Sequence, residues 1–176
     1  MAYHSATHSA TPIRAVNGIA MVLVICFLLA TPSTLFVLAK PKAMTFYVHE
    51  RRAPPASLIL VAPTTGPLTK VKWGSVLVID NEVRETNSTD STYLGRQLGS
   101  VVVGSDGATF YASFTYLLNT TAYAGSLTLA GIVQSGKMVV TGGTDSFNLA
   151  RGVASVQTLS NTPTAAIYEY TLRLKY

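Results

Sequence analysis

Residues 165–176 read AAIYEYTLRLKY, and the character of their side chains alternates along the chain. The even-numbered residues from 166 to 176 are apolar or aromatic, whereas the odd-numbered residues from 169 to 175 are polar or charged. Successive side chains of a β-strand point to opposite faces, so this period of two predicts a strand with one face in a core and one in solvent.

Seven further segments have the composition of short strands and are separated by turn-forming residues. They are residues 44–49, 58–62, 75–81, 94–105, 109–118, 126–134 and 147–159. Ser105-Asp106-Gly107 is a strong turn signal, which predicts a hairpin between the two segments that flank it. None of the segments keeps a helical period, so we predict an all-β fold.

Eight such segments in one small domain can form an antiparallel barrel or a sandwich. We predict an eight-stranded antiparallel β-barrel, because closure removes the edges that apolar strands would otherwise expose. Barrels of this size can enclose one small ligand, which makes the interior the first place to look for a site.

The first 39 residues have the composition of a secretory signal peptide. A polar start precedes the apolar run 19–30, and the small residues Val37 and Ala39 fit a cut before Lys40. The run is about half of the roughly 20 apolar residues that a membrane-spanning helix needs. We therefore predict that residues 1–39 are removed during export.

The mature protein is then one domain over residues 40–176, secreted to the extracellular space. A cut after Ala30 and a retained signal-anchor are the alternatives. Two glycosylation sequons, at Asn87 and Asn119, lie among turn-forming residues and also favour the secretory route. The single cysteine, Cys26, lies in the leader, so the mature chain has neither a disulfide nor a thiol nucleophile.

Composition argues against several functions. The formal net charge is +5 and the bases are scattered, so we expect no nucleic-acid binding, although weak attraction to acidic wall polysaccharide fits this charge. His49 is the only histidine beyond the leader, so a histidine metal site or a Ser-His-Asp triad lacks its partners. Gly142-Gly143-Thr144 lacks the lysine of a phosphate-binding loop and fits a turn. We expect no metal, no cofactor and no redox chemistry by this chain alone.

Two charged residues stand beside apolar strand positions. Asp80 shares its strand face with Val78, and a carboxylate at a barrel mouth can act as a general acid or base. Arg151 lies between Leu149 and Val153 on one face, where a guanidinium requires a partner or a ligand. The plainer interpretations are a turn aspartate and a structural ion pair.

Several motifs, in order and at suitable spacing, resemble those of the plant dirigent family. They are FYVHE (46–50), WGSVLVIDN (73–81), LGRQLG (94–99), YAGSL (123–127), GGTDSFNLARG (142–152) and the closing strand 168–176. The resemblance covers residues 44–176. It implies an eight-stranded antiparallel barrel akin to allene oxide cyclase, assembled as a homo-oligomer (trimer or dimer) in the apoplast or cell wall.

Dirigent proteins of the lignan type hold phenoxy radicals of coniferyl alcohol, which a separate laccase or peroxidase makes, so that one face couples. The resemblance therefore implies regio- and stereoselectivity in lignan and phenylpropanoid biosynthesis, without oxidase activity of the chain's own. In physical terms this is orientation of the reactants with acid–base assistance.

The resemblance also implies site residues. The family's strand-end aspartate falls on Asp80 and the arginine of its Ala-Arg-Gly motif on Arg151, which would together line one polar end of an apolar cavity. Lignan-forming members have an aspartate where this chain has Ser146, with Asp145 displaced by one residue, and a cavity tyrosine where it has Phe114. These three positions are the substrate-binding candidates, and their departures weaken the expectation of pinoresinol-type activity.

Two other functions fit the sequence. One is a stand-alone cyclase or isomerase of a quinone-methide-like intermediate that uses Asp80 as its proton donor or acceptor. The other is a non-catalytic, wall-associated binding barrel, which Ser146 and Phe114 favour. Whether the chain is an enzyme in its own right depends on whether it acts without an oxidase.

Overall fold

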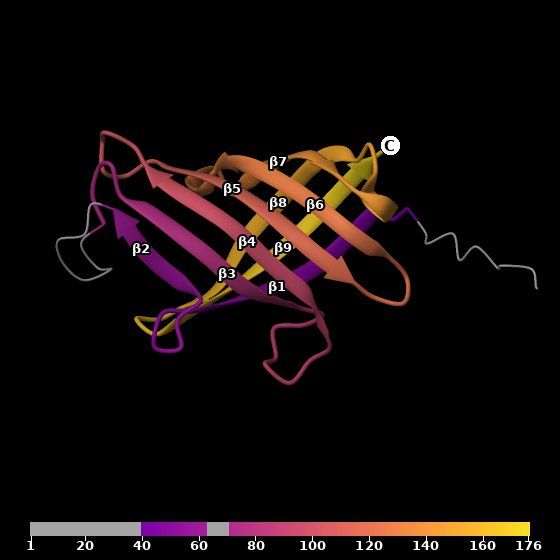
Figure 1. The fold of residues 1–176 in the computed structure, drawn as a ribbon, viewed down its shortest axis with the longest axis horizontal. Helices are drawn as coiled ribbons and strands as arrows, with labels where there is room; N and C mark the ends of the chain where they lie inside the picture. Colours follow the sequence, from indigo (N-terminus) through magenta and orange to yellow (C-terminus); the bar gives the residue numbers. More distant parts are fainter. Residues whose placement is uncertain (1–39, 63–70) are drawn as a thin grey trace, which may run out of the picture. The chain divides into compact units, whose positions relative to one another are not determined.

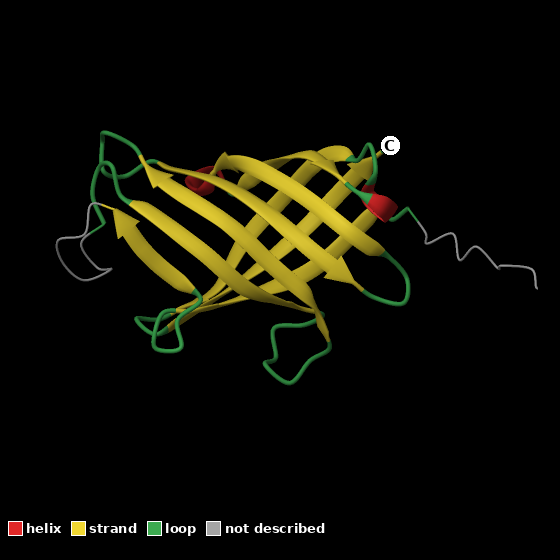
Figure 2. Ribbon diagram, in the orientation of Figure 1, coloured by secondary structure: helices red, strands yellow, loops and turns green. Residues whose placement is uncertain are grey.

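β-strands make up most of the part of the chain that the structure describes (Figure 2). The computed structural model describes residues 40–62 and 71–176, so the predicted leader, with its cleavage sites and Cys26, lies outside the described residues. The strands are β1 (Ala43–Arg51), β2 (Leu58–Ala62), β3 (Val76–Arg84), β4 (Tyr93–Val103), β5 (Phe110–Asn119), β6 (Ala124–Ile132), β7 (Lys137–Gly143), β8 (Arg151–Asn161) and β9 (Ala165–Lys175). The described residues also form two short 3-10 helices, η2 (Val133–Ser135) and η3 (Asp145–Phe147). Within the described ranges, no helix combines the length and apolarity needed to cross a membrane.

The sheet closes on itself (Figure 1). Neighbouring strands are antiparallel and follow the order β1-β9-β8-β7-β6-β5-β4-β3-β2. The edge of β3 that faces away from β4 pairs with two strands. Its C-terminal part pairs with β1, where Val83 is opposite Val48, and its N-terminal part pairs with β2, where Ile79 is opposite Leu58. The predicted all-β, eight-stranded antiparallel barrel is confirmed, with β2 as a ninth strand alongside β3.

Strand β7 differs from the prediction, because the sequence analysis assigned no strand to residues 137–143 and counted 58–62 among its eight. Only residues 138–140 are an apolar run, and the two glycines after them resemble a turn. In the structure these glycines end β7, and a Cβ on Gly143 would lie 2.5 Å from the carbonyl oxygen of Ser126 on β6. The chain needs a glycine there because two backbones approach closely.

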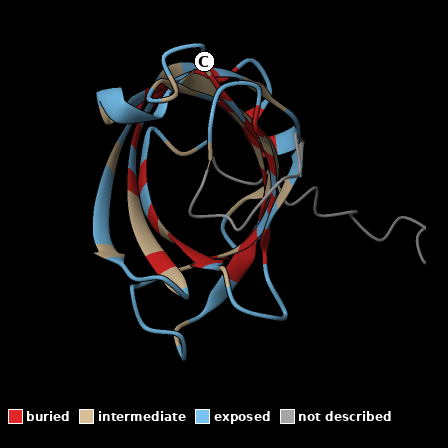
Figure 3. Ribbon diagram, turned by 90° about the vertical axis from the view of Figure 1, so that its left-hand side faces the viewer, coloured by how far each residue is buried: buried red, intermediate tan, exposed pale blue. Residues whose placement is uncertain are grey.

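The inner face of the barrel carries the buried side chains. Figure 3 shows the buried residues in red along the strands of the barrel wall. On β9, Leu172 and Leu174 are buried and Arg173 is exposed, as the alternation predicted. Phe46, Tyr116 and Tyr170 form an aromatic cluster, with ring centroids 5.0 to 5.6 Å apart. Aromatic pairs at such separations stabilise a core beyond their burial, so this cluster gives the barrel a rigid interior.

The hairpin between β4 and β5 forms as predicted. Oδ1 of Asp106 accepts hydrogen bonds from the backbone N–H groups of Ala108 (2.9 Å) and Thr109 (2.8 Å). The Thr109 hydroxyl also donates a hydrogen bond to Asp106, through Oδ2. The hydroxyl bond first, and then the two backbone bonds, lower the pKa of Asp106 to about 2. The turn therefore keeps an ionised aspartate at physiological pH.

Candidate functional site

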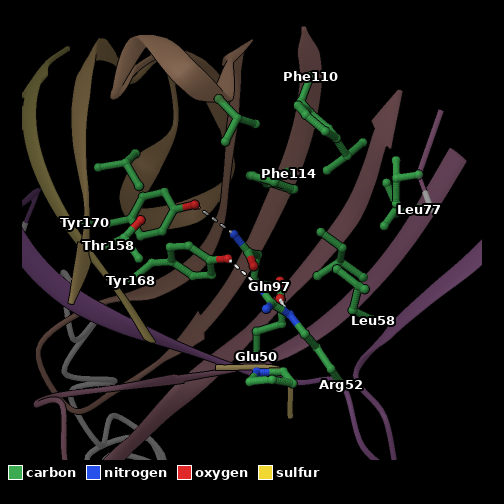
Figure 4. Close-up of a pocket in the computed structure, with 16 residues that line it drawn as sticks. Glu50, Arg52, Leu58, Leu77, Gln97, Phe110, Phe114, Thr158, Tyr168 and Tyr170 are labelled. Atoms are coloured by element: carbon green, nitrogen blue, oxygen red, sulfur yellow. Dashed lines mark hydrogen bonds and ion pairs between the residues drawn. The ribbon is translucent and has the colours of Figure 1, made fainter. Parts of the chain in front are cut away.

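A cavity of about 410 Å³ lies in the barrel (Figure 4). It lies toward the end of the barrel where the turn with Asp106 joins β4 to β5. Most of its wall is apolar. The apolar lining residues are Leu58, Val71, Leu77, Ile79, Val101, Phe110, Phe114, Val133, Val156 and Pro163. A cavity with such walls selects small, largely apolar ligands and leaves orientation to its few polar groups.

Glu50, Arg52 and Tyr168 form the polar side of the cavity, where β1 ends and β9 begins (Figure 4). Glu50 points inward because it shares the strand face of the buried residues Phe46 and Val48. Nε of Arg52 donates a 2.7 Å hydrogen bond to Oε1 of Glu50, and Nη2 donates to the Tyr168 hydroxyl at 3.3 Å. The polar side is thus an ion pair whose arginine is hydrogen-bonded to a phenol.

The guanidinium of Arg52 also holds the loop between β8 and β9. Its Nη1 donates to Oδ1 of Asn161 and to the carbonyl oxygen of Thr162, both at 2.8 Å. Burial disfavours the charge of Arg52, but the hydrogen bond and ion pair with Glu50 outweigh it and raise the pKa of Arg52. The cation is therefore permanent and fixed in place.

Burial raises the pKa of Tyr168, and the nearby Glu50 carboxylate raises it further, while Arg52 opposes the shift. The Tyr168 phenol stays protonated at physiological pH and is available as a hydrogen-bond donor. Among the described residues that line the cavity, Glu50 is the one carboxylate and hence the natural proton acceptor.

A buried chain of hydrogen bonds includes two residues of the cavity wall, Gln97 and Tyr170. Oγ of Ser57 donates to Oδ1 of Asn81 (2.6 Å), and Nδ2 of Asn81 donates to Oε1 of Gln97 (2.8 Å). Nε2 of Gln97 then donates to the hydroxyls of Tyr116 (2.7 Å) and Tyr170 (3.3 Å). Burial raises the pKa of Tyr170 to about 12, so this phenol stays neutral. Such fully satisfied polar networks fix the rotamers of their members.

The structure does not bring Asp80 and Arg151 together, and neither lines the cavity. Both are exposed on the outer face of the barrel, Asp80 on β3 and Arg151 at the start of β8. Asp80 forms an ion pair with Arg96 of the neighbouring strand β4, and Arg151 donates to the carbonyl oxygen of Ala150 at 2.8 Å. The expectation that they form one polar end of the cavity is contradicted.

The physical reason is strand parity. The inner face of β3 carries Leu77, Ile79 and Asn81, whereas Val78 is 45% exposed on the outer face with Asp80. Apolar residues occupy both faces of β3. A residue that shares a strand face with valines therefore does not have to point into the barrel.

The three substrate-binding candidates have different environments. Phe114 is 5% exposed and lines the cavity. Ser146 is buried in η3, where its Oγ accepts a hydrogen bond from the backbone N–H of Ala124 at 3.2 Å, and it does not line the cavity. Asp145 is exposed beside it and accepts from the Thr144 hydroxyl at 3.0 Å. Only Phe114 is placed to contact a ligand in the cavity.

Sequence analysis missed the polar side of the cavity. A signal for Glu50 was present, since it continues the inward series Phe46 and Val48 in the first strand. No comparable signal exists for Arg52, whose partners Asn161 and Thr162 lie far away in the sequence.

A closed antiparallel barrel with an aromatic, apolar cavity and one acid–base group defines a class of protein. Barrels with these features bind one small, largely apolar molecule, and a few polar groups set the orientation of that molecule.

The sequence model of the dirigent-like protein family matches residues 41–175. A dirigent protein of Sinopodophyllum hexandrum is 30% identical over 133 residues, which cover 66% of this chain and 68% of that protein. Dirigent protein 25 of Arabidopsis thaliana is 29% identical over 105 residues, which are 57% of this chain and 27% of that protein. The chain belongs to the dirigent family.

Solved structures with the same fold include the pterocarpan synthase dirigent proteins GePTS1 and PsPTS1, both at a TM-score of 0.68. They are 22% and 21% identical to this chain and cover 75% and 76% of it, and the match covers 82% and 94% of their own chains. Pyocyanin demethylase matches with a TM-score of 0.53 at 17% identity, over 76% of this chain and 99% of its own. At these identities the likeness establishes the fold.

Proposed function

We propose that this dirigent protein gives regio- and stereoselectivity to the coupling of monolignol-type phenoxy radicals, which a separate laccase or peroxidase generates. The observation that carries the proposal is the apolar cavity of about 410 Å³ with the Glu50–Arg52 pair at its side. An aromatic ring fits the apolar wall beside Phe114, while its oxygen substituents turn toward the polar side. Binding in one orientation exposes one face of the radical to its partner.

The polar side also supports proton transfer after the coupling. When a hydroxyl group closes a ring on a quinone methide, the hydroxyl loses a proton and the quinone methide oxygen gains one. Glu50 is positioned to accept the hydroxyl proton, and the Tyr168 phenol, held by Arg52, is positioned to donate a hydrogen bond to the quinone methide oxygen. That oxygen takes its proton from water, and Glu50 then returns its own proton to water.

The test is the coupling of coniferyl alcohol by laccase, with and without the mature protein. We expect an enantiomeric excess by chiral chromatography only when the folded protein is present, and no consumption of the alcohol when laccase is left out. Heat-denatured protein is the control. Racemic products at saturating protein would contradict the proposal.

A second candidate is a stand-alone cyclase of a quinone-methide-like intermediate. It is favoured by the presence of an acid–base group inside the cavity, and Glu50 replaces Asp80 as the residue that would carry it. Turnover of a preformed intermediate without any oxidase distinguishes this function from selective radical coupling.

We further propose that the protein is secreted to the apoplast or cell wall and carries glycans at Asn87 and Asn119. Both asparagines are exposed, one between β3 and β4 and one where β5 ends. The cavity lies toward the opposite ends of these strands, so glycans there would leave its mouth open. Mass spectrometry of protein secreted from plant cells should find both sites occupied and an N-terminus at Lys40. Recovery of Met1 on a membrane-retained, unglycosylated protein would reject this.

A homo-oligomer, trimer or dimer, is proposed to bury the outer face of β3 to β6. Val102 on β4 faces Tyr111 on β5, and Tyr111 faces Ile132 on β6. Their exposed fractions are 43%, 49% and 39%, which is unusual for adjacent large apolar side chains on a free surface. Burial of such a face is the usual source of stability in homo-oligomers.

A further inference from the structure

Five basic residues gather where β1 begins, β8 begins and β9 ends. Arg151 on β8 is paired with Lys175 on β9, and Arg173 of β9 is paired with Ala43 of β1. Lys42 precedes Ala43, and its carbonyl oxygen accepts a hydrogen bond from the N–H of Leu174 at 2.8 Å. With Lys40 and the C-terminal Tyr176, these residues form what we name the cationic face: Lys40, Lys42, Arg151, Arg173, Lys175 and Tyr176.

The cations of this face are exposed and have no carboxylate partner among the described residues. The ion pairs among the described residues involve other cations. They join Arg51 to Glu82, Arg52 to Glu50, Arg84 to Glu82 and Arg96 to Asp80. The C-terminal carboxylate of Tyr176 also lies at this face but forms no ion pair with these cations, and the other acids nearest in the fold are engaged elsewhere. Glu169, farther along the outer face of β9, is the register partner of Tyr47 and raises the pKa of that phenol, and Asp145 accepts a hydrogen bond from the Thr144 hydroxyl. The positive charge is therefore available to an external anion.

The spacing of these cations is set by the sheet. Side chains two apart on one strand, such as Arg173 and Lys175, repeat about every 6.6 Å, and neighbouring strands lie about 4.8 Å apart. The Tyr176 ring lies at the edge, where Lys40 Nζ is 5.0 Å from its centroid and its hydroxyl donates to the carbonyl oxygen of Pro41 at 2.9 Å. An exposed aromatic ring is thus fixed beside a regular array of charges.

We propose that the cationic face binds an acidic polysaccharide, a polymer of uronic acid sugars with one carboxylate per residue. The arginines suit carboxylates because the guanidinium can donate two parallel hydrogen bonds. The fixed ring of Tyr176 offers a flat apolar surface to a sugar ring. The cationic face carries one aromatic residue, Tyr176, whereas proteins that bind single-stranded nucleic acid stack successive bases on several aromatic rings.

This site is independent of the proposed function. The cationic face lies where β1 and β8 begin and β9 ends, whereas the cavity lies toward the opposite ends of these strands. The face is also separate from the apolar outer face of β3 to β6, so an oligomer formed there leaves it exposed. Polymer attachment would hold the protein in a polyanionic matrix with the cavity mouth free.

The test uses the untagged mature protein and soluble polygalacturonate, with fully methyl-esterified polygalacturonate as the uncharged probe. The variant is Arg173→Gln/Lys175→Gln. The matched control is Lys72→Gln/Lys137→Gln, which removes the same charge from exposed positions away from the face. We expect about tenfold weaker binding for the variant, and less than about twofold for the control, from the loss of exposed ion pairs.

Three outcomes would overturn the proposal. They are equal losses in the variant and its control, equal binding to the esterified polymer, or tighter binding to duplex DNA or to vesicles with anionic lipid than to polygalacturonate. Binding that weakens steeply between low and physiological salt is expected, since exposed charges are screened. The variant should keep the product selectivity of the wild type, so loss of polymer binding and loss of the cavity's function are distinguishable.

Discussion

Glu50→Gln is expected to abolish the enantiomeric excess of the coupling products while leaving the barrel folded. Glutamine keeps the shape of the side chain but neither accepts the proton nor pairs with Arg52. For a ring closure that depends on acid–base catalysis, the rate should fall by about 10²–10⁴-fold. Arg52 keeps its hydrogen bonds to Asn161 and Thr162, so the expected loss of stability is roughly 1–3 kcal/mol.

Asp80→Asn is the matched control, because it neutralises a carboxylate on the outer face of the same barrel. We expect this variant to keep wild-type selectivity. Glu50→Asp retains the carboxylate on a shorter side chain and should recover part of the selectivity. Enantiomeric excess or cyclisation rate is measured after circular dichroism has shown that each variant is folded. Selectivity that is lost in Asp80→Asn and kept in Glu50→Gln would return the site to the sequence-based prediction.

Gly152→Ala is expected to prevent folding or to lower the free energy of unfolding by more than about 4 kcal/mol. A Cβ at residue 152 would lie 1.9 Å from the carbonyl oxygen of Arg173 and 3.0 Å from its carbonyl carbon. The φ of Gly152 is also +156°, a conformation that other residues rarely adopt. The clash is with the backbone of β9, which is held on its other side by β1, so no side chain can turn aside to relieve it.

Gly107→Ala separates the effect of the positive φ from the effect of the clash with a neighbouring backbone. Gly107 has a φ of +68° in the β4–β5 turn, but a Cβ there would have no atom within 4 Å. Alanine at this position should therefore cost only about 1–2 kcal/mol, the usual penalty for a left-handed backbone conformation. Chemical denaturation of both variants gives the comparison. Equal losses of stability in the two would show that the approach of β8 to β9 is not as close as the structure has it.

The sequence by itself determined the all-β class and every strand except β7, and it favoured a closed barrel. The alternation over residues 165–176 needs only the period of two of an extended chain, and the Asp106 turn needs only local hydrogen bonds, so both follow from neighbouring residues. The absence of any helical period pointed to an all-β domain, and the cost of exposed edges pointed to a barrel. Strand β7 was missed because its glycines serve a close approach to β6, which is not a local property.

Only the tertiary structure decided which face of each strand lines the cavity. Val78 and Ile79 are both apolar neighbours on β3, yet one is 45% and the other 4% exposed, because the outer face of this barrel is apolar too. Hydrophobicity therefore did not reveal that Asp80 points outward. The polar side of the cavity depends on closure, since Arg52 meets Asn161 only when β1 and β9 pair and bring the β8–β9 loop to the end of β1. Register and closure are set by pairings between distant segments, and a single strand's pattern does not encode them.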